Sequence, residues 1–173
     1  MNYFSDGSTK DKLILLSFLD ALNLEVTKEQ ITTACAQYDL IPYFELQNAL
    51  YELEEEGFLA TVPRPFGMAY CILQKGKDTI SAFSETLPLS ERENIADNAD
   101  MCRAQFRNET QYTHRIDKLP SGAYKVVLRA IEAHGELFSV SLSFASSRDA
   151  NSACKKWAES ANEIYSALNA FLS

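Results

Sequence analysis

The sequence predicts a mixed α+β fold with a mainly helical first half and a second half built around one antiparallel sheet. Three observations predict it. Apolar residues recur at helical spacing in three segments before residue 57, two short apolar strands follow at 58–73, and three more strand candidates precede a long amphipathic C-terminal segment. The order helix, short strand, helix, helix and hairpin is typical of a winged helix-turn-helix. We expect this domain at residues 1–85 and an α+β dimerisation or ligand-sensing domain at 86–173.

The first two helices have clear start signals. Residues 8–11 have the capping-box form, and an apolar stripe follows them. The members of this stripe are Leu15, Phe18, Leu19 and Leu22. After a short extended piece, Thr27 and Gln30 can satisfy each other's backbone donors and so begin a second helix. This helix should end near Asp39, because Pro42 disfavours helical geometry at the residue before it.

A third helix and a hairpin complete the first domain. The apolar stripe of this helix consists of Leu46, Ala49, Leu50 and Leu53, and Gly57 provides a left-handed stop. Strand candidates at 58–62 and 68–73 are joined by 63–67, whose prolines and glycine suit an exposed hairpin tip. This hairpin is the expected wing.

The second half predicts a helix from Ser90, a three-stranded antiparallel meander and a final helix capped by Ser146. The expected strands are 112–119, 123–133 and 136–145, with a turn at His134-Gly135. In the last strand one face is apolar, and the final helix should cover it. The members of its apolar stripe are Ala150, Ala153, Trp157, Ala161, Ile164, Leu168 and Phe171.

The opposite sheet face mixes charged and apolar residues. Val127 and Ile131 alternate there with Lys125 and Arg129. Such a face is suited to a partner subunit or a small-molecule effector, and helix-turn-helix proteins commonly use two half-sites. We therefore expect a homodimer.

Composition places the chain among globular proteins. Apolar residues make up 46% of it, and no window approaches the roughly 18–20 continuous apolar residues of a membrane span. Residues 1–6 lack the pattern of a secretory signal, which predicts a cytoplasmic protein without membrane contact. The four cysteines, Cys35, Cys71, Cys102 and Cys154, form no CxxC pair and are interpreted as small buried thiols.

The sequence carries no motif of a catalytic or cofactor site. Its glycines form no nucleotide-binding loop, and His114 and His134 lack partners at metal-ligand spacing. We expect neither an enzyme nor a bound cofactor or metal.

The third helix and the hairpin carry the residues suited to DNA recognition. Gln47 and Asn48 can bond adenine edges, and neighbouring aromatic side chains can contact thymine methyls or phosphates. An arginine at the wing, Arg64, can enter a minor groove. The expected DNA contacts are Tyr43, Phe44, Gln47, Asn48, Tyr51, Arg64, Lys75 and Lys77.

Charge favours a different role. Residues 1–84 hold six Lys/Arg against twelve Asp/Glu, a net charge of −6, whereas residues 85–173 hold ten against twelve, a net charge of −2. Four of these acids, Glu52, Glu54, Glu55 and Glu56, end the third helix and would repel phosphate. The alternative to a DNA-binding transcriptional regulator is a winged helix that contacts protein, with the aromatic residues packing against a partner. A continuous positive strip through Lys28, Arg64, Lys75 and Lys77 would favour DNA.

Several short stretches also match a known family. These are residues 12–16, 44–47 and 53–59, with Trp157 and Ile164-Tyr165 near the end. The chain resembles the bacterial family called domain of unknown function 4364 over most of its length. The resemblance implies a winged-helix fold and a role in transcription, and it supplies no ligand or site.

Overall fold

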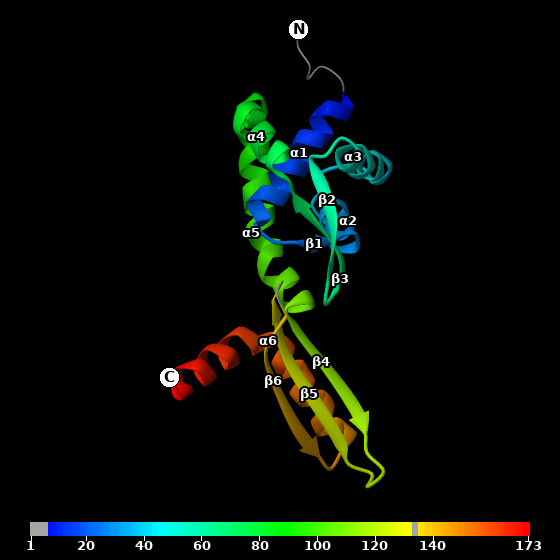
Figure 1. The fold of residues 1–173 in the computed structure, drawn as a ribbon, viewed down its shortest axis with the longest axis vertical. Coiled ribbons are helices and arrows are strands. Elements are labelled where there is room, and N and C mark those ends of the chain that lie inside the picture. The colour runs from blue at the N-terminus through cyan, green and yellow to red at the C-terminus, as the bar shows by residue number, and fades with distance from the viewer. Residues whose placement is uncertain (1–6, 133–134) are drawn as a thin grey trace. The chain divides into compact units, whose positions relative to one another are not determined.

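The computed structural model of the protein describes residues 7–132 and 135–173. In these ranges it is a mixed α+β structure with six α-helices, one short 3-10 helix and two small antiparallel sheets (Figure 1). The chain divides into two compact units, and the division falls between Ala104 and Gln105. The division falls inside a helix, whereas the sequence suggested a boundary before residue 86.

The N-terminal unit consists of helices around a small sheet. Its elements are α1 (Gly7–Leu22), β1 (Val26–Thr27), α2 (Lys28–Gln37), α3 (Tyr43–Glu55), β2 (Leu59–Arg64), β3 (Gly67–Ile72), α4 (Gln74–Phe83), the 3-10 helix η1 (Ser84–Thr86) and most of α5 (Leu89–Thr110). The strand order is β1-β3-β2, with Tyr70 of β3 between Val26 and Thr61. The fold expectation named a single three-stranded sheet, in the second half. A second one exists because β1 pairs with the hairpin.

Local signals set the ends of these helices. Thr27 and Gln30 form the predicted capping box: the Gln30 amide N–H donates to Thr27 Oγ1 at 3.3 Å, and the Thr27 amide donates to Gln30 Oε1 at 3.1 Å. Gly57 has a φ of 75° just after α3, the left-handed geometry that glycine adopts at low cost. The predicted start of α2 and the predicted stop of α3 are therefore confirmed.

The hairpin is longer than predicted. β2 runs through Pro63 to Arg64, and only Pro65 and Phe66 form the turn. Pro63 is tolerated within the ladder because β2 is an edge strand, where a missing backbone donor need not break pairing. Arg64 therefore lies in the strand, opposite Gly67, and not at a loose tip.

α1 is the centre of the N-terminal core. It contacts α3, α4 and β3, and apolar residues from more than one of its faces are buried: Leu13, Ile14, Leu15, Leu16, Phe18, Leu19 and Leu22. α4 approaches closely through Gly76, where a Cβ atom would lie 2.7 Å from the backbone oxygen of Phe58. The sequence predicted a single buried stripe on α1, whereas the structure buries residues on more than one face of this helix.

The C-terminal unit is the predicted meander with a covering helix. It contains β4 (Tyr112–Lys118), β5 (Tyr124–Glu132), β6 (Gly135–Phe144) and α6 (Ser147–Leu172), with strand order β4-β5-β6. Leu128 of β5 lies between His114 and Val140. The expected strand end at Ala133 and the turn residue His134 lie outside the described residues.

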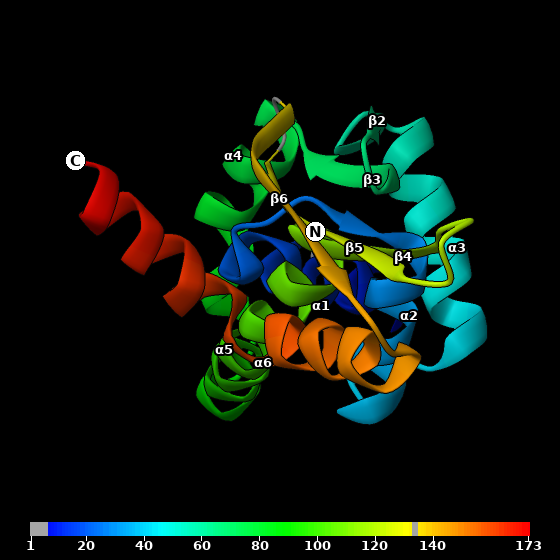
Figure 2. The same ribbon diagram turned by 90° about the horizontal axis from the view of Figure 1, so that it is seen from below.

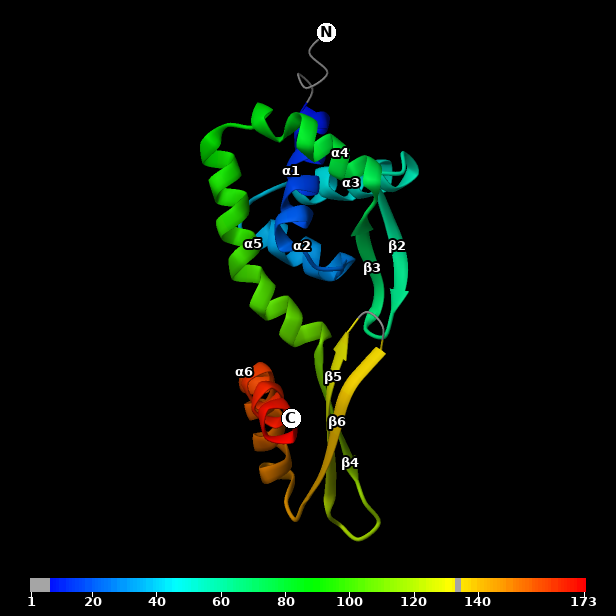
Figure 3. The same cartoon turned by 60° about the vertical axis from the view of Figure 1, so that its left-hand side comes forward.

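α6 covers one face of this sheet, as Figure 3 shows. Ser146 caps it as predicted, accepting a hydrogen bond from the Asp149 amide at 3.1 Å. Trp157 fills the core between α6 and the sheet, together with Val126, Leu128, Ala150, Cys154 and Ala161. The indole N–H of Trp157 donates to the Thr113 backbone oxygen at 3.1 Å, which ties α6 to β4.

The end of α6 departs from the expectation. Its backbone is non-helical at Ser160, with φ −131° and ψ 19°. Soon after this kink the apolar side chains of α6 no longer pack against the sheet. Ile164 is exposed, and Phe171 leaves 88% of its surface open. The prediction that these two residues cover the sheet is therefore wrong, because the kink turns the last part of α6 away from it (Figure 2).

The outer face of the sheet is also less open than expected. Val127 is only 7% exposed, and Ile131 is partly buried. Charged side chains surround them, including an ion pair from Arg129 to Glu136 at 3.3 Å. This face offers little apolar surface to a partner.

Candidate functional site

Among the described residues of the N-terminal unit, the outward face of α3 carries three strongly exposed aromatic side chains. Phe44 is 77% exposed, Tyr51 is 67% exposed and Tyr43 is also open to solvent. The rings of Tyr43 and Phe44 meet edge to face, with centroids 5.5 Å apart. Phe44 and Tyr51 point away from the buried side of α3, which carries Leu46 and Leu50, and Tyr43 is the first residue of the helix.

Two amide side chains accompany these rings. Asn48 is exposed and Gln47 is partly exposed, so both lie on the outward side of α3. The spacing of Phe44, Asn48 and Tyr51 places them on one helix face. The structure thus brings together all five of the α3 residues that the sequence selected. We call Tyr43, Phe44, Gln47, Asn48 and Tyr51 the α3 surface.

The acidic end of α3 is partly neutralised within the molecule. Lys12 Nζ of α1 binds Glu52 at 2.7 Å and Glu56 at 3.1 Å. Partial burial alone lowers the pKa of Lys12, but the hydrogen bonds to these two carboxylates outweigh it and raise the pKa above its ordinary value. Glu54 accepts a hydrogen bond from the Thr61 hydroxyl at 2.7 Å. Most of the negative charge at this end therefore has a structural partner.

Arg64 is held by an acidic residue. Its guanidinium forms a two-pronged ion pair with Glu25, through Nε to one oxygen and through Nη2 to the other at 2.7 Å. The hydrogen bonding to Glu25 raises the pKa of Arg64, and a third bond runs from Nη1 to the Pro63 backbone oxygen at 3.3 Å. To reach a minor groove, Arg64 would first have to leave Glu25.

The two lysines of α4 lie apart from the α3 surface. Lys75 Nζ donates to the Glu56 backbone oxygen at 2.6 Å and lies 4.0 Å from the centre of the Phe58 ring. It thus caps the negative end of α3. α3 has 13 residues, which makes it about 20 Å long, so Lys75 lies far from Tyr43 at the other end. Lys77 lines a shallow depression that also contains Asp20 and Glu25.

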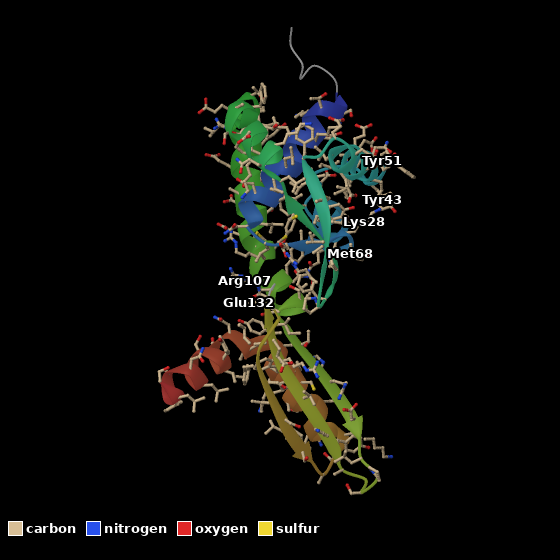
Figure 4. The ribbon with its side chains drawn as sticks, in the orientation of Figure 1. Lys28, Tyr43, Tyr51, Met68, Arg107 and Glu132 are labelled. Carbon is tan, nitrogen blue, oxygen red and sulfur yellow. The ribbon has the colours of Figure 1, made fainter. Side chains whose placement is uncertain are left out.

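The structure adds two residues that the list of expected contacts omitted. Figure 4 shows Tyr51, Tyr43, Lys28 and Met68 following one another along one side of the N-terminal unit. Lys28 is the first residue of α2 and is exposed, and Met68 of β3 is also exposed. The helix start at Thr27 could have drawn attention to Lys28, because a helix N-terminus carries partial positive charge. The exposure of Met68 depends on the hairpin register and had no local signal.

Outside the α3 surface, the described residues offer one apolar hollow and buried cysteine thiols. A hollow of about 370 Å³ in the N-terminal unit is lined mainly by apolar side chains of α1, α3 and α4, among them Leu13, Leu53 and Phe83. Burial raises the pKa of the Cys35 thiol to about 12, with a smaller contribution from Cys102, so Cys35 is a poor nucleophile. In the described ranges, no three His, Cys, Asp or Glu side chains come together as a metal site, and none of the helices combines the length and the apolar character needed to cross a membrane.

Comparison with known proteins identifies the family. Neither the curated proteins nor the solved structures contain a match to this chain. The family described as "Domain of unknown function (DUF4364)" matches residues 11–172, which include the α3 surface and most of both compact units. The match extends over nearly the whole sequence, so the chain belongs to the DUF4364 family.

Proposed function

We propose that this protein is a cytoplasmic DNA-binding transcriptional regulator whose N-terminal unit is a winged helix with α3 as the recognition helix. The order α1, β1, α2, α3, β2, β3 and the antiparallel strand order β1-β3-β2 support this proposal. In such domains the second helix of the helix-turn-helix enters the major groove, and the hairpin lies beside it. The α3 surface carries the proposal.

The α3 surface suits contact with base edges. Recognition helices read bases with residues near their N-terminus, and the α3 surface occupies the first nine residues of a 13-residue helix. Asn48 and Gln47 offer the donor and acceptor pair that matches adenine, and the tyrosine hydroxyls can bond phosphates. The acids at the far end of α3 interfere less than their number suggests, because Lys12 pairs with Glu52 and Glu56 and offsets one of their two negative charges.

Few cations remain for phosphate contact. Arg64 pairs with Glu25 and Lys75 bonds the Glu56 carbonyl, whereas Lys28 has an exposed side chain at the positive end of α2. We infer that Lys28 and the first backbone N–H groups of α2 supply the main phosphate contact. The sequence-independent affinity for DNA should therefore be weak, and it should depend only weakly on salt concentration.

Asn48→Ala tests base reading by α3. On the preferred site, the substitution should cost about 1–3 kcal/mol of binding free energy, because the adenine edge loses a two-point contact. On unrelated DNA the affinity should not change. Fluorescence anisotropy at low salt, with DNA from upstream of the protein's own gene and a shuffled duplex, measures both. Ser81→Ala on the exposed side of α4 is the control and should bind like the parent. If the parent discriminates no sequence at low salt, α3 does not read DNA.

Glu25→Gln tests whether Arg64 is a latent DNA contact. Loss of the carboxylate charge weakens the hold on the guanidinium, so Arg64 can bind phosphate and the slope of log affinity against log salt should steepen by about 0.9. Glu85→Gln removes the same charge from an exposed position and should leave the slope unchanged. Salt titrations of the two variants make the comparison. Equal slopes would show that Arg64 serves only the fold.

One observation favours contact with protein as a second candidate function. The predicted positive strip is interrupted, because Arg64 and Lys75 have partners inside the unit, while Phe44 leaves 77% of its surface in solvent. Exposed aromatic residues are common at the centres of protein interfaces. If the anisotropy titration finds no DNA affinity, the same α3 surface is the place to look for a protein partner. Phe44→Ala should then abolish the interaction.

A further inference from the structure

The edge strand β6 is the least protected edge among the described strands. Edge strands usually carry charges or prolines that prevent pairing with another chain. β4, the other edge of the same sheet, follows this rule with Arg115, Asp117 and Lys118. β6 contains one charged residue, Glu136, which is paired with Arg129, and residues 137–144 contain neither charge nor proline.

The inner face of the sheet is incompletely covered at this edge. α6 lies mainly over β4 and β5, where Trp157 contacts Tyr112 and Phe138 with ring centroids 5.8 Å apart in each pair. Leu142 of β6 points to the same face as Val126 but stays 43% exposed. Leu137, at the register shift between β5 and β6, is exposed as well. Apolar surface that belongs to the core side of the sheet is thus left open beside β6.

The end of α6 reaches past the same edge. After the kink at Ser160 the helix still contacts β6 at first, because the Tyr165 ring lies 5.6 Å from the Phe138 ring, and its last turns then continue beyond the strands (Figures 1 and 2). Phe171 and Leu172 are 88% and 84% exposed there. A helical segment of about twelve residues is marginal in water by itself, so this piece of α6 needs a surface to pack on.

We propose that β6 pairs antiparallel with β6 of a second copy of this chain, and that the end of each α6 covers the open inner face of the partner's sheet. Each copy of the chain offers both parts of the contact, an open strand edge and a helix that extends past that edge. This is the self-complementary arrangement of a two-fold dimer. Two three-stranded sheets then form one continuous sheet.

Charge and size are consistent with a second copy as the occupant. In an antiparallel pair centred near Val140, the two Glu136 side chains lie at opposite ends of the ladder, so no like charges meet. In the same register, inner-face residues oppose inner-face residues, and Phe138 meets Leu142 of the other copy. Each copy would contribute the ten residues of β6 and the twelve residues 161–172. This number lies within the roughly 20–30 residues per side that a stable interface uses.

This interface replaces the one that the sequence suggested. The expected dimer used the outer sheet face at Val127 and Ile131, but Val127 is only 7% exposed. The proposal does not depend on DNA binding, because the groups that carry it belong to the C-terminal unit. Its failure would leave the proposed role of α3 unchanged.

Sedimentation equilibrium of the full chain, without DNA, tests the proposal. The parent at tens of micromolar should have twice the monomer mass of 19.4 kDa. The double variant Phe171→Glu/Leu172→Glu places charges on the proposed contact and should return to the monomer mass. The matched control Ser166→Glu/Ala170→Glu adds the same charge to exposed positions on the other side of the same segment and should remain dimeric.

Hydrogen exchange of the unmodified protein locates the contact without mutation. Exchange of β6 amides should slow several-fold as the concentration rises through the dissociation constant, while β4 amides should not respond. A parent that stays monomeric would overturn the proposal. So would a dimer that survives Phe171→Glu/Leu172→Glu, or one whose β6 amides show no dependence on concentration.

Discussion

Replacing Trp157 with alanine should lower the free energy of unfolding of the C-terminal unit by about 3–5 kcal/mol. The side chain is 1% exposed and is the largest in the core between α6 and the sheet. Alanine would leave a cavity beside Tyr112 and Phe138 and would remove the hydrogen bond from α6 to the Thr113 carbonyl. Urea unfolding followed by far-UV circular dichroism measures the change.

Two further variants separate the causes of that loss. Trp157→Phe keeps most of the ring but leaves the Thr113 oxygen without its donor, so it should cost about 1–3 kcal/mol. Lys156→Ala changes the exposed neighbouring residue and should stay within about 0.5 kcal/mol of the parent. If Trp157→Ala unfolds at the same urea concentration as Lys156→Ala, Trp157 does not hold the unit together.

Leu50→Ala should destabilise the N-terminal unit by about 2–5 kcal/mol. Leu50 is 1% exposed, on the buried side of α3 that packs against α1, and its loss opens a cavity under the α3 surface. A thermal melt should shift to lower temperature, and hydrogen exchange should assign the lost protection to residues 7–104.

Two other substitutions on the same helix serve as controls for Leu50→Ala: a conservative change of Leu50 itself and a change at an exposed position. Leu50→Met keeps the volume and should cost less than about 1.5 kcal/mol. Glu55→Ala, on the exposed side of α3, should leave the melt almost unchanged. A Leu50→Ala melt that coincides with that of Glu55→Ala would contradict the assignment of α3 to the core.

Local sequence signals predicted the elements well. Each helix-end signal satisfies backbone groups only a few residues away, as at Thr27, Gly57 and Ser146. The effect of such a signal can therefore be predicted from a short segment. Period-two and helical spacing predicted β4, β5, β6 and α6 for the same reason. Errors arose where the partner of a segment is distant: the short strand β1 was expected, but its pairing with β3 into a second sheet was not.

The candidate site divides in the same way. The five residues of the α3 surface were selected together from the sequence, and the structure leaves all five at least partly exposed while Leu46, Leu50 and Leu53 are buried. The state of the basic residues could not be predicted. Glu25 is 39 residues from Arg64, and Glu56 is 19 residues from Lys75, so only the folded chain shows that these cations are engaged.

The sequence by itself determined the helices, the strands, the hairpin and the exposed side of α3, since each follows from hydrogen bonding and burial over neighbouring residues. The tertiary structure decided three other features: the burial of α1 on more than one face, the pairing of Arg64 with Glu25, and the kink that carries Phe171 past β6. Each of these depends on which distant side chain fills the space nearby. Packing of that kind is a property of the whole fold, and no periodicity within one segment records it.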